Sequence, residues 1–78
     1  MNEFILKELN EEKVVYLYYP NGHKEFGEIE YIFSEKQVHV VKRGTIDDTG
    51  RFAHKAKRQI QRCAKENNFP EKMIQAWY

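Results

Sequence analysis

The strongest constraint on the fold is a run of β-branched and aromatic residues that ends in a tight-turn signal. The run is KVVYLYY, residues 13–19, and Pro20-Asn21-Gly22 follows it. Such a composition is typical of a β-strand. Asn-Gly is the strongest short hairpin signal, because both central residues of a type I′ turn need positive φ. The sequence therefore predicts a hairpin whose second strand covers residues 25–33.

Counting outward from a two-residue loop gives the expected register of this hairpin. Tyr18 would lie opposite Glu25 and Tyr16 opposite Gly27, so that the Tyr16 ring covers the gap left by the glycine. A second turn near residues 34–36 leads to a further strand at 37–42, and residues 4–7 form another short strand before the hairpin. The face expected to meet a helix is the more apolar one, with Val14, Tyr16, Tyr18, Ile29, Tyr31, Phe33, Val38 and Val40.

From residue 51 to residue 67 the hydrophobic period changes to that of a helix. Asp48 or Thr49 is the expected N-cap. One arc of this helix is apolar and small, with Phe52, Ala53, Ala56, Ile60, Cys63 and Ala64. The opposite arc is basic, with Arg51, Lys55, Arg58, Arg62 and Lys65. We call this second set the basic stripe.

The segment after Pro70 is open to two interpretations. Proline at a first helical position and the composition of residues 71–76 favour a short terminal helix. The alternative is a short strand, residues 73–78, that joins the sheet. In either case Met73, Ile74 and Trp77 are expected to pack on the core.

The length of 78 residues is that of one domain, 1–78. Cys63 is the only cysteine, so no disulfide forms within the chain, and a reducing compartment is favoured. The opening residues do not resemble a signal peptide. No apolar run approaches the roughly 18–20 residues of a membrane span. We therefore expect a cytoplasmic protein that does not enter membranes.

Charge is unevenly distributed along the chain, although the net charge is only +1. Residues 1–30 are acidic and residues 42–65 are basic. An acidic sheet and a basic helix that attract each other within the fold would explain this pattern, and so would a charged partner.

Residues with catalytic or metal-binding chemistry are scattered. His23, His39 and His54 fall in a turn, a strand and a helix, without zinc-ligand spacing. Cys63 lies on the apolar arc, where burial disfavours a thiolate. Glu28 and Glu30 share a strand face, which is more typical of solubility than of acid–base catalysis. We expect no enzyme, no metal and no cofactor.

Two surfaces remain as candidates for function. The basic stripe could follow a phosphate backbone while Tyr19 or Phe26 stacks on bases. It could also bind an acidic protein. The alternative is that the stripe is a solvated helix face without a binding role. The second sheet face would form an apolar protein-interaction surface, unless the tail with Trp77 covers it. That surface comprises Val15, Leu17, Tyr19, Phe26 and Ile32, with Val41 beside it.

The chain resembles short bacterial proteins of uncharacterised function. The resemblance rests on the opening FILK (4–7), the tyrosine-rich strand before Pro20-Asn21-Gly22, and the ending FP…AWY (69–78). It implies a bacterial, cytoplasmic origin and carries no motif of known chemistry.

The expected fold is α+β: an antiparallel β-meander of three or four strands packed against one long helix. The function we favour from the sequence is that of a small, non-catalytic protein-interaction module, whose partner is another protein or, in a homodimer, a second copy of the chain. The alternative is a nucleic-acid-binding module that uses the basic face of helix 51–67.

Overall fold

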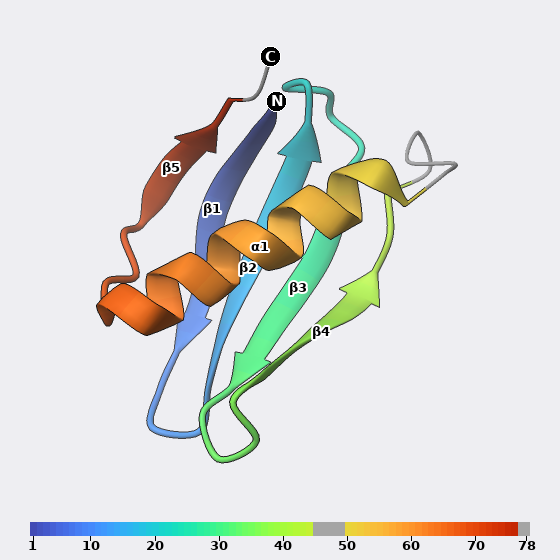
Figure 1. The fold of residues 1–78 in the computed structure, drawn as a ribbon. Coiled ribbons are helices and arrows are strands. Elements are labelled where there is room, and N and C mark those ends of the chain that lie inside the picture. The colour runs from blue at the N-terminus through green and yellow to red at the C-terminus, as the bar shows by residue number, and fades with distance from the viewer. Residues whose placement is uncertain (45–49, 77–78) are drawn as a thin grey trace.

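The computed structural model describes residues 1–44 and 50–76. Within them, an antiparallel sheet is crossed on one face by a helix (Figure 1). The elements in chain order are β1 (Asn2–Leu9), β2 (Lys13–Pro20), β3 (Gly27–Ile32), β4 (Gln37–Lys42), α1 (Arg51–Glu66) and β5 (Lys72–Gln75). The strand order is β4-β3-β2-β1-β5. The α+β class is confirmed, but the sheet has five strands where three or four were expected.

The fifth strand corrects the interpretation of the tail, which favoured a helix. β5 runs antiparallel to β1, with Phe4 opposite Met73 and Ile5 opposite Lys72. The Leu6 N–H donates to the Glu71 carbonyl at 2.8 Å. A helix this short is marginal on its own, whereas the free edge of β1 supplies ready backbone partners. Pairing with β1 therefore outweighs the local helix propensity.

Side chains of β5 alternate between the two faces of the sheet. Met73 is half-buried beneath α1, as expected, and is part of the packing around the core. Ile74 is 65% exposed, so the prediction that it packs on the core is wrong. Trp77, the third residue expected to pack, lies outside the described residues.

The predicted hairpin turn is present, but the register predicted for its two strands is wrong. Asn21 and Gly22 have φ of 51° and 72°, and the His23 N–H donates to the Pro20 carbonyl at 3.0 Å. Pairing then places Tyr18, not Tyr16, opposite Gly27. A Cβ at Gly27 would overlap the Tyr18 ring, which fits there only because the glycine has no side chain.

The register is displaced by two residues, so every side chain keeps its predicted face. Val14, Tyr16, Tyr18 and Ile29 are all buried on the helix side, as the period-two pattern indicated. The second turn is also where it was predicted, with Lys36 at φ 55°. Its N–H donates to the Ile32 carbonyl at 2.9 Å.

The apolar arc of α1 packs on this sheet face, as predicted. Ala53, Ala56, Ile60 and Cys63 are buried, while Phe52 and Ala64 are half-buried. Beneath them, the Phe4 and Tyr16 rings meet edge to face with centroids 6.1 Å apart. Small residues on the arc let the helix approach these rings closely.

The ends of α1 are set by backbone conformation. Gly50 occupies the N-cap with φ 75° and no side-chain cap; the expected caps, Asp48 and Thr49, lie outside the described residues. At the other end Asn67 is left-handed, with φ 51°. The Asn68 N–H donates to the Cys63 carbonyl at 3.0 Å and closes the helix.

We predict that Ile60→Asp largely unfolds the protein. Ile60 is fully buried, so the substitution places an unpaired carboxylate in the core at a cost of about 4 kcal/mol or more. Gln61→Asp is the matched control, because Gln61 is the exposed neighbour. Circular dichroism melts measure both variants. A melting temperature for Ile60→Asp equal to that of Gln61→Asp would contradict the described orientation of α1.

We predict that Gly27→Ala destabilises the hairpin by about 1–3 kcal/mol, because the new methyl group meets the Tyr18 ring. In a Tyr18→Leu background, Gly27→Ala should lower the free energy of unfolding by far less. A double-mutant cycle by denaturant unfolding measures the coupling. If the two backgrounds show equal costs, the ring and the glycine do not determine the register.

Candidate functional site

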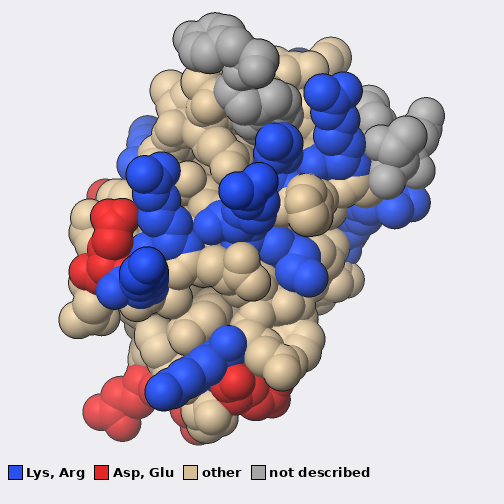
Figure 2. Space-filling view, in the orientation of Figure 1, with Lys and Arg blue, Asp and Glu red and all other residues tan. Residues whose placement is uncertain are grey.

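The basic stripe lies on the solvent side of α1, because the apolar arc faces the sheet. Arg51, Arg58, Arg62 and Lys65 are exposed and Lys55 is half-buried. The whole helix carries six lysine and arginine side chains against one carboxylate, Glu66. Figure 2 shows Lys and Arg side chains spread along α1 on this face of the molecule. The structure therefore brings all five predicted cations onto one surface.

Glu66, the one carboxylate of α1, pairs weakly with a cation of the stripe. Glu66 contacts Arg62 at 3.7 Å from Oε1 to Nε, and the two side chains are 56% and 74% exposed. An exposed i,i+4 pair of this kind contributes about 0.3–0.5 kcal/mol. So weak a pair leaves the Arg62 guanidinium able to meet another anion.

The carboxylates of the sheet pair on its opposite face. Glu28 contacts the Nζ of Lys7 at 2.9 Å, and Glu30 contacts that of Lys13 at 3.8 Å. Both glutamates alternate with the buried Ile29, so they point away from α1. These two glutamates therefore do not take part in the expected attraction between an acidic sheet and a basic helix. Glu28 and Glu30 instead lie on the opposite side of the sheet from the basic stripe.

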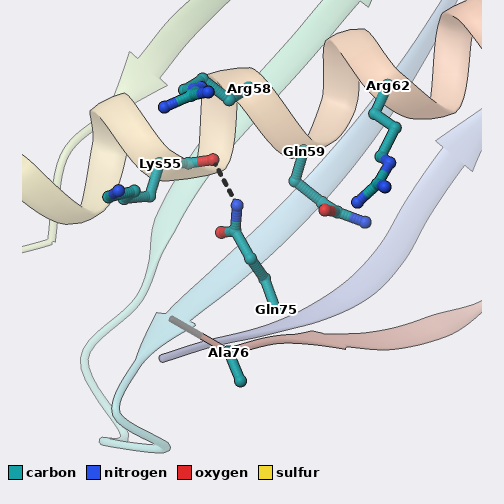
Figure 3. Close-up of a pocket in the computed structure, with 6 residues that line it drawn as sticks. All are labelled: Lys55, Arg58, Gln59, Arg62, Gln75 and Ala76. Atoms are coloured by element: carbon teal, nitrogen blue, oxygen red, sulfur yellow. Dashed lines mark hydrogen bonds between the residues drawn. The ribbon is translucent and has the colours of Figure 1, made fainter. Parts of the chain in front are cut away.

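A groove of about 460 Å³ lies between α1 and the end of β5 (Figure 3). Its lining residues are Lys55, Arg58, Gln59, Arg62, Gln75 and Ala76. In Figure 3, Gln59 and Arg62 reach from α1 toward β5, while the side chains of Lys55 and Arg58 extend away from Gln75. The groove thus combines cations of the stripe with two amides.

Hydrogen bonds fix one wall of this groove. The Gln75 Nε2 donates to the Lys55 carbonyl at 2.8 Å, and the Gln75 Oε1 accepts from the Nδ2 of Asn2 at 3.3 Å. Asn2 is fully buried and its Nδ2 also donates to the Phe52 carbonyl at 3.1 Å. These bonds hold β5, β1 and α1 together at one end of the molecule.

Gln59 and Gln75 were missed by the sequence reasoning, because a helical tail would not have placed an amide beside α1. A usable signal was present in Lys72-Met73-Ile74-Gln75, which alternates polar and apolar residues with the period of a strand.

The predicted protein-interaction face lies on the opposite side of the sheet. Val15 is buried, while Leu17, Tyr19, Phe26 and Ile32 are half-buried. The Lys7–Glu28 and Lys13–Glu30 pairs described above lie on the same face. β5 and β1 add Ile74 and Ile5, which are 65% and 40% exposed. This face is therefore a mixture of apolar side chains and ion pairs.

Tyr19 and Phe26 also belong to this outer face, which contradicts their expected place beside the basic stripe. Their ring centroids are 5.6 Å apart, and the Nζ of Lys42 lies 4.6 Å from the Phe26 centroid. The sheet separates them from the solvent face of α1. They cannot stack on bases held by the stripe.

Cys63 is buried, as predicted for a small packing residue. Burial, and then the charge of Glu66, raise the pKa of its thiol. Within residues 1–44 and 50–76, no three His, Cys, Asp or Glu side chains are grouped so as to hold a metal ion. In the same part of the chain, no helix is both long and apolar enough to cross a membrane.

Comparison of the chain with known protein families, curated proteins and solved structures gives no significant match. Function is therefore inferred from the two surfaces described above.

Proposed function

We propose that this protein is a small, non-catalytic cytoplasmic binding module that holds the phosphate backbone of nucleic acid on the basic stripe. The observation that carries this proposal is the alignment of five cations along the solvent side of α1, with one exposed carboxylate among them. Glu28 and Glu30 pair with lysines on the far side of the sheet, so they do not neutralise the stripe.

The dimensions and chemistry of the stripe fit a phosphate array. At 1.5 Å per residue, Arg51 and Lys65 are about 21 Å apart along the helix axis. Duplex DNA carries one phosphate per roughly 1.7 Å of its axis, so several phosphates lie within that span. Three of the five cations are arginines, whose planar guanidinium groups bind phosphate oxygens in pairs.

The absence of exposed apolar groups on α1 favours nucleic acid over an acidic protein. Protein interfaces usually have an apolar centre, whereas nucleic-acid interfaces are more polar and strongly positive. The large apolar side chains that are exposed in the described residues all lie outside α1: Met1, Ile5, Leu9, Val40, Val41 and Ile74. Since α1 carries no exposed Phe, Tyr or Trp, contacts with phosphates should dominate, and binding should tolerate many base sequences.

The second candidate is the protein-interaction module, acting through the outer sheet face as a homodimer. The exposed Ile5 and Ile74 support it, because they add apolar area to Leu17, Tyr19 and Phe26. The ion pairs on the same face weaken it, since they would have to be desolvated on association.

We predict salt-dependent binding of DNA or RNA by the basic stripe. Each phosphate contact should contribute a log–log slope of about −0.9 for duplex DNA or −0.7 for a single strand. Arg58→Gln with Arg62→Gln should lower the slope by about two contacts. Because both side chains are exposed, the melting temperature should change little.

Fluorescence anisotropy with labelled nucleic acids at several salt concentrations measures this slope. Lys7→Gln with Lys13→Gln is the control, because these lysines pair on the far side of the sheet. An absence of binding at low salt would contradict the proposal, and so would equal effects of the two double variants.

We predict, for the second candidate, a sedimentation mass near twice 9.4 kDa at micromolar concentration. Ile74→Lys should return the protein to a monomer while preserving its fold, whereas Gln61→Lys, at an exposed site on α1, should not. A wild-type protein that stays monomeric at high concentration would remove this candidate.

A further inference from the structure

We propose that the groove between α1 and β5 is a phosphate-binding subsite, which holds one backbone phosphate of the nucleic acid bound by the stripe. This inference rests on the proposed function and deepens it. A free phosphate ion presents the same chemistry, so the test below includes it separately.

Cations of the stripe line the groove. Arg58 and Lys55 border it, and Arg62 reaches toward β5; none of its described lining residues carries a carboxylate. Glu66 meets Arg62 through Nε alone, at 3.7 Å. The terminal guanidinium nitrogens of Arg62 form no ion pair within the described part of the chain, so they are available to an oxyanion.

An amide donor is also available. The Gln59 Nε2 has a thioether as its partner, the Met73 Sδ at 3.5 Å. Thioether sulfur is a weak acceptor, whereas a phosphate oxygen accepts a short, charge-assisted bond. Figure 3 shows Gln59 and Arg62 reaching toward β5 from the same side of α1. An oxyanion between them would replace a poor hydrogen bond with a strong one.

The opposite wall is already ordered. Gln75 is held by the Lys55 carbonyl and by Asn2, which is itself buried. A site with a fixed wall loses little conformational entropy when a ligand binds. A volume of about 460 Å³ exceeds that of a phosphate group, which leaves room for the adjoining sugar.

Neighbouring hollows have different linings. The one toward the end of α1 shares Gln59 and Arg62 with the groove, but Glu66 also lines it. The one on the outer side of α1, beside Gln61 and Lys65, includes Glu66. The one beside β4 has Arg43, His54 and Lys57 but no side-chain amide. The one between β1 and β5 is lined by Glu3 and apolar side chains around a single cation, Lys72. Cations, amides and a fixed wall come together in the groove between α1 and β5.

The test compares Gln59→Glu with Gln61→Glu. The two variants have the same net charge, and the substitutions lie two positions apart on α1, but Gln61 lies outside the groove. Anisotropy with a labelled duplex should show binding about tenfold weaker for Gln59→Glu, against about twofold for Gln61→Glu. Thermal melts confirm that both variants are folded. Equal losses would overturn the subsite while salt-dependent binding remains; no binding by the wild type would overturn the proposed function itself.

A second measurement keeps the inference testable if Gln59→Glu fails to fold. The side-chain amide NMR signal of Gln59 in the wild-type protein is followed during titration with inorganic phosphate and, separately, with the duplex. The duplex should shift this signal more than that of Gln61. A shift with phosphate alone would show that the groove also takes the free ion. An unmoved Gln59 signal in a duplex-bound protein would overturn the subsite.

Discussion

The packing of Ile60 against the sheet is the interaction on which the rest of the structure depends. Ile60 is fully buried over a face that holds Tyr16 and Ile29, and burying a side chain of this size contributes about 1.5–3 kcal/mol. Ala53 and Ala56 let the helix approach closely on the same side. A helix turned the other way would bury arginines without partners, at a cost of several kcal/mol per charge. The same contact that forms the core therefore directs the basic stripe toward solvent.

The separation of Glu28 and Glu30 from the basic stripe follows from this orientation. The alternation of β3 places Ile29 under α1 and directs Glu28 and Glu30 to the other side, where Lys7 and Lys13 meet them. The stripe is thus not neutralised by these glutamates, although the net charge is only +1. β5 completes the basic side, since Gln75 forms one wall of a groove whose other wall is α1. The proposed function depends on the positive surface of α1, and the proposed phosphate subsite depends on the ordered recess beside it.

Patterns that depend on local periodicity were predictable, and features that depend on distant partners were not. The period of two assigned Tyr16 and Ile29 to the helix side, and the helical period identified both arcs of α1. The hairpin register was missed because the overlap between the Tyr18 ring and any side chain at residue 27 is decided by packing, not by the turn. β5 was missed because four residues have weak intrinsic preference, and their hydrogen bonds come from β1, far away in the chain. The groove depends on β5 and on Asn2, so only the stripe half of the candidate site was visible in the sequence.

The central claim is that the solvent face of α1 and the adjoining end of β5 form the binding surface. Backbone amide NMR on an isotope-labelled protein, titrated with a short unlabelled DNA duplex at low salt, tests it most directly. The account predicts shifts concentrated on residues 51–66 and around Gln75, with the amides of Leu17, Glu28 and Glu30 unmoved. Shifts concentrated on β2 and β3, with α1 unaffected, would contradict it.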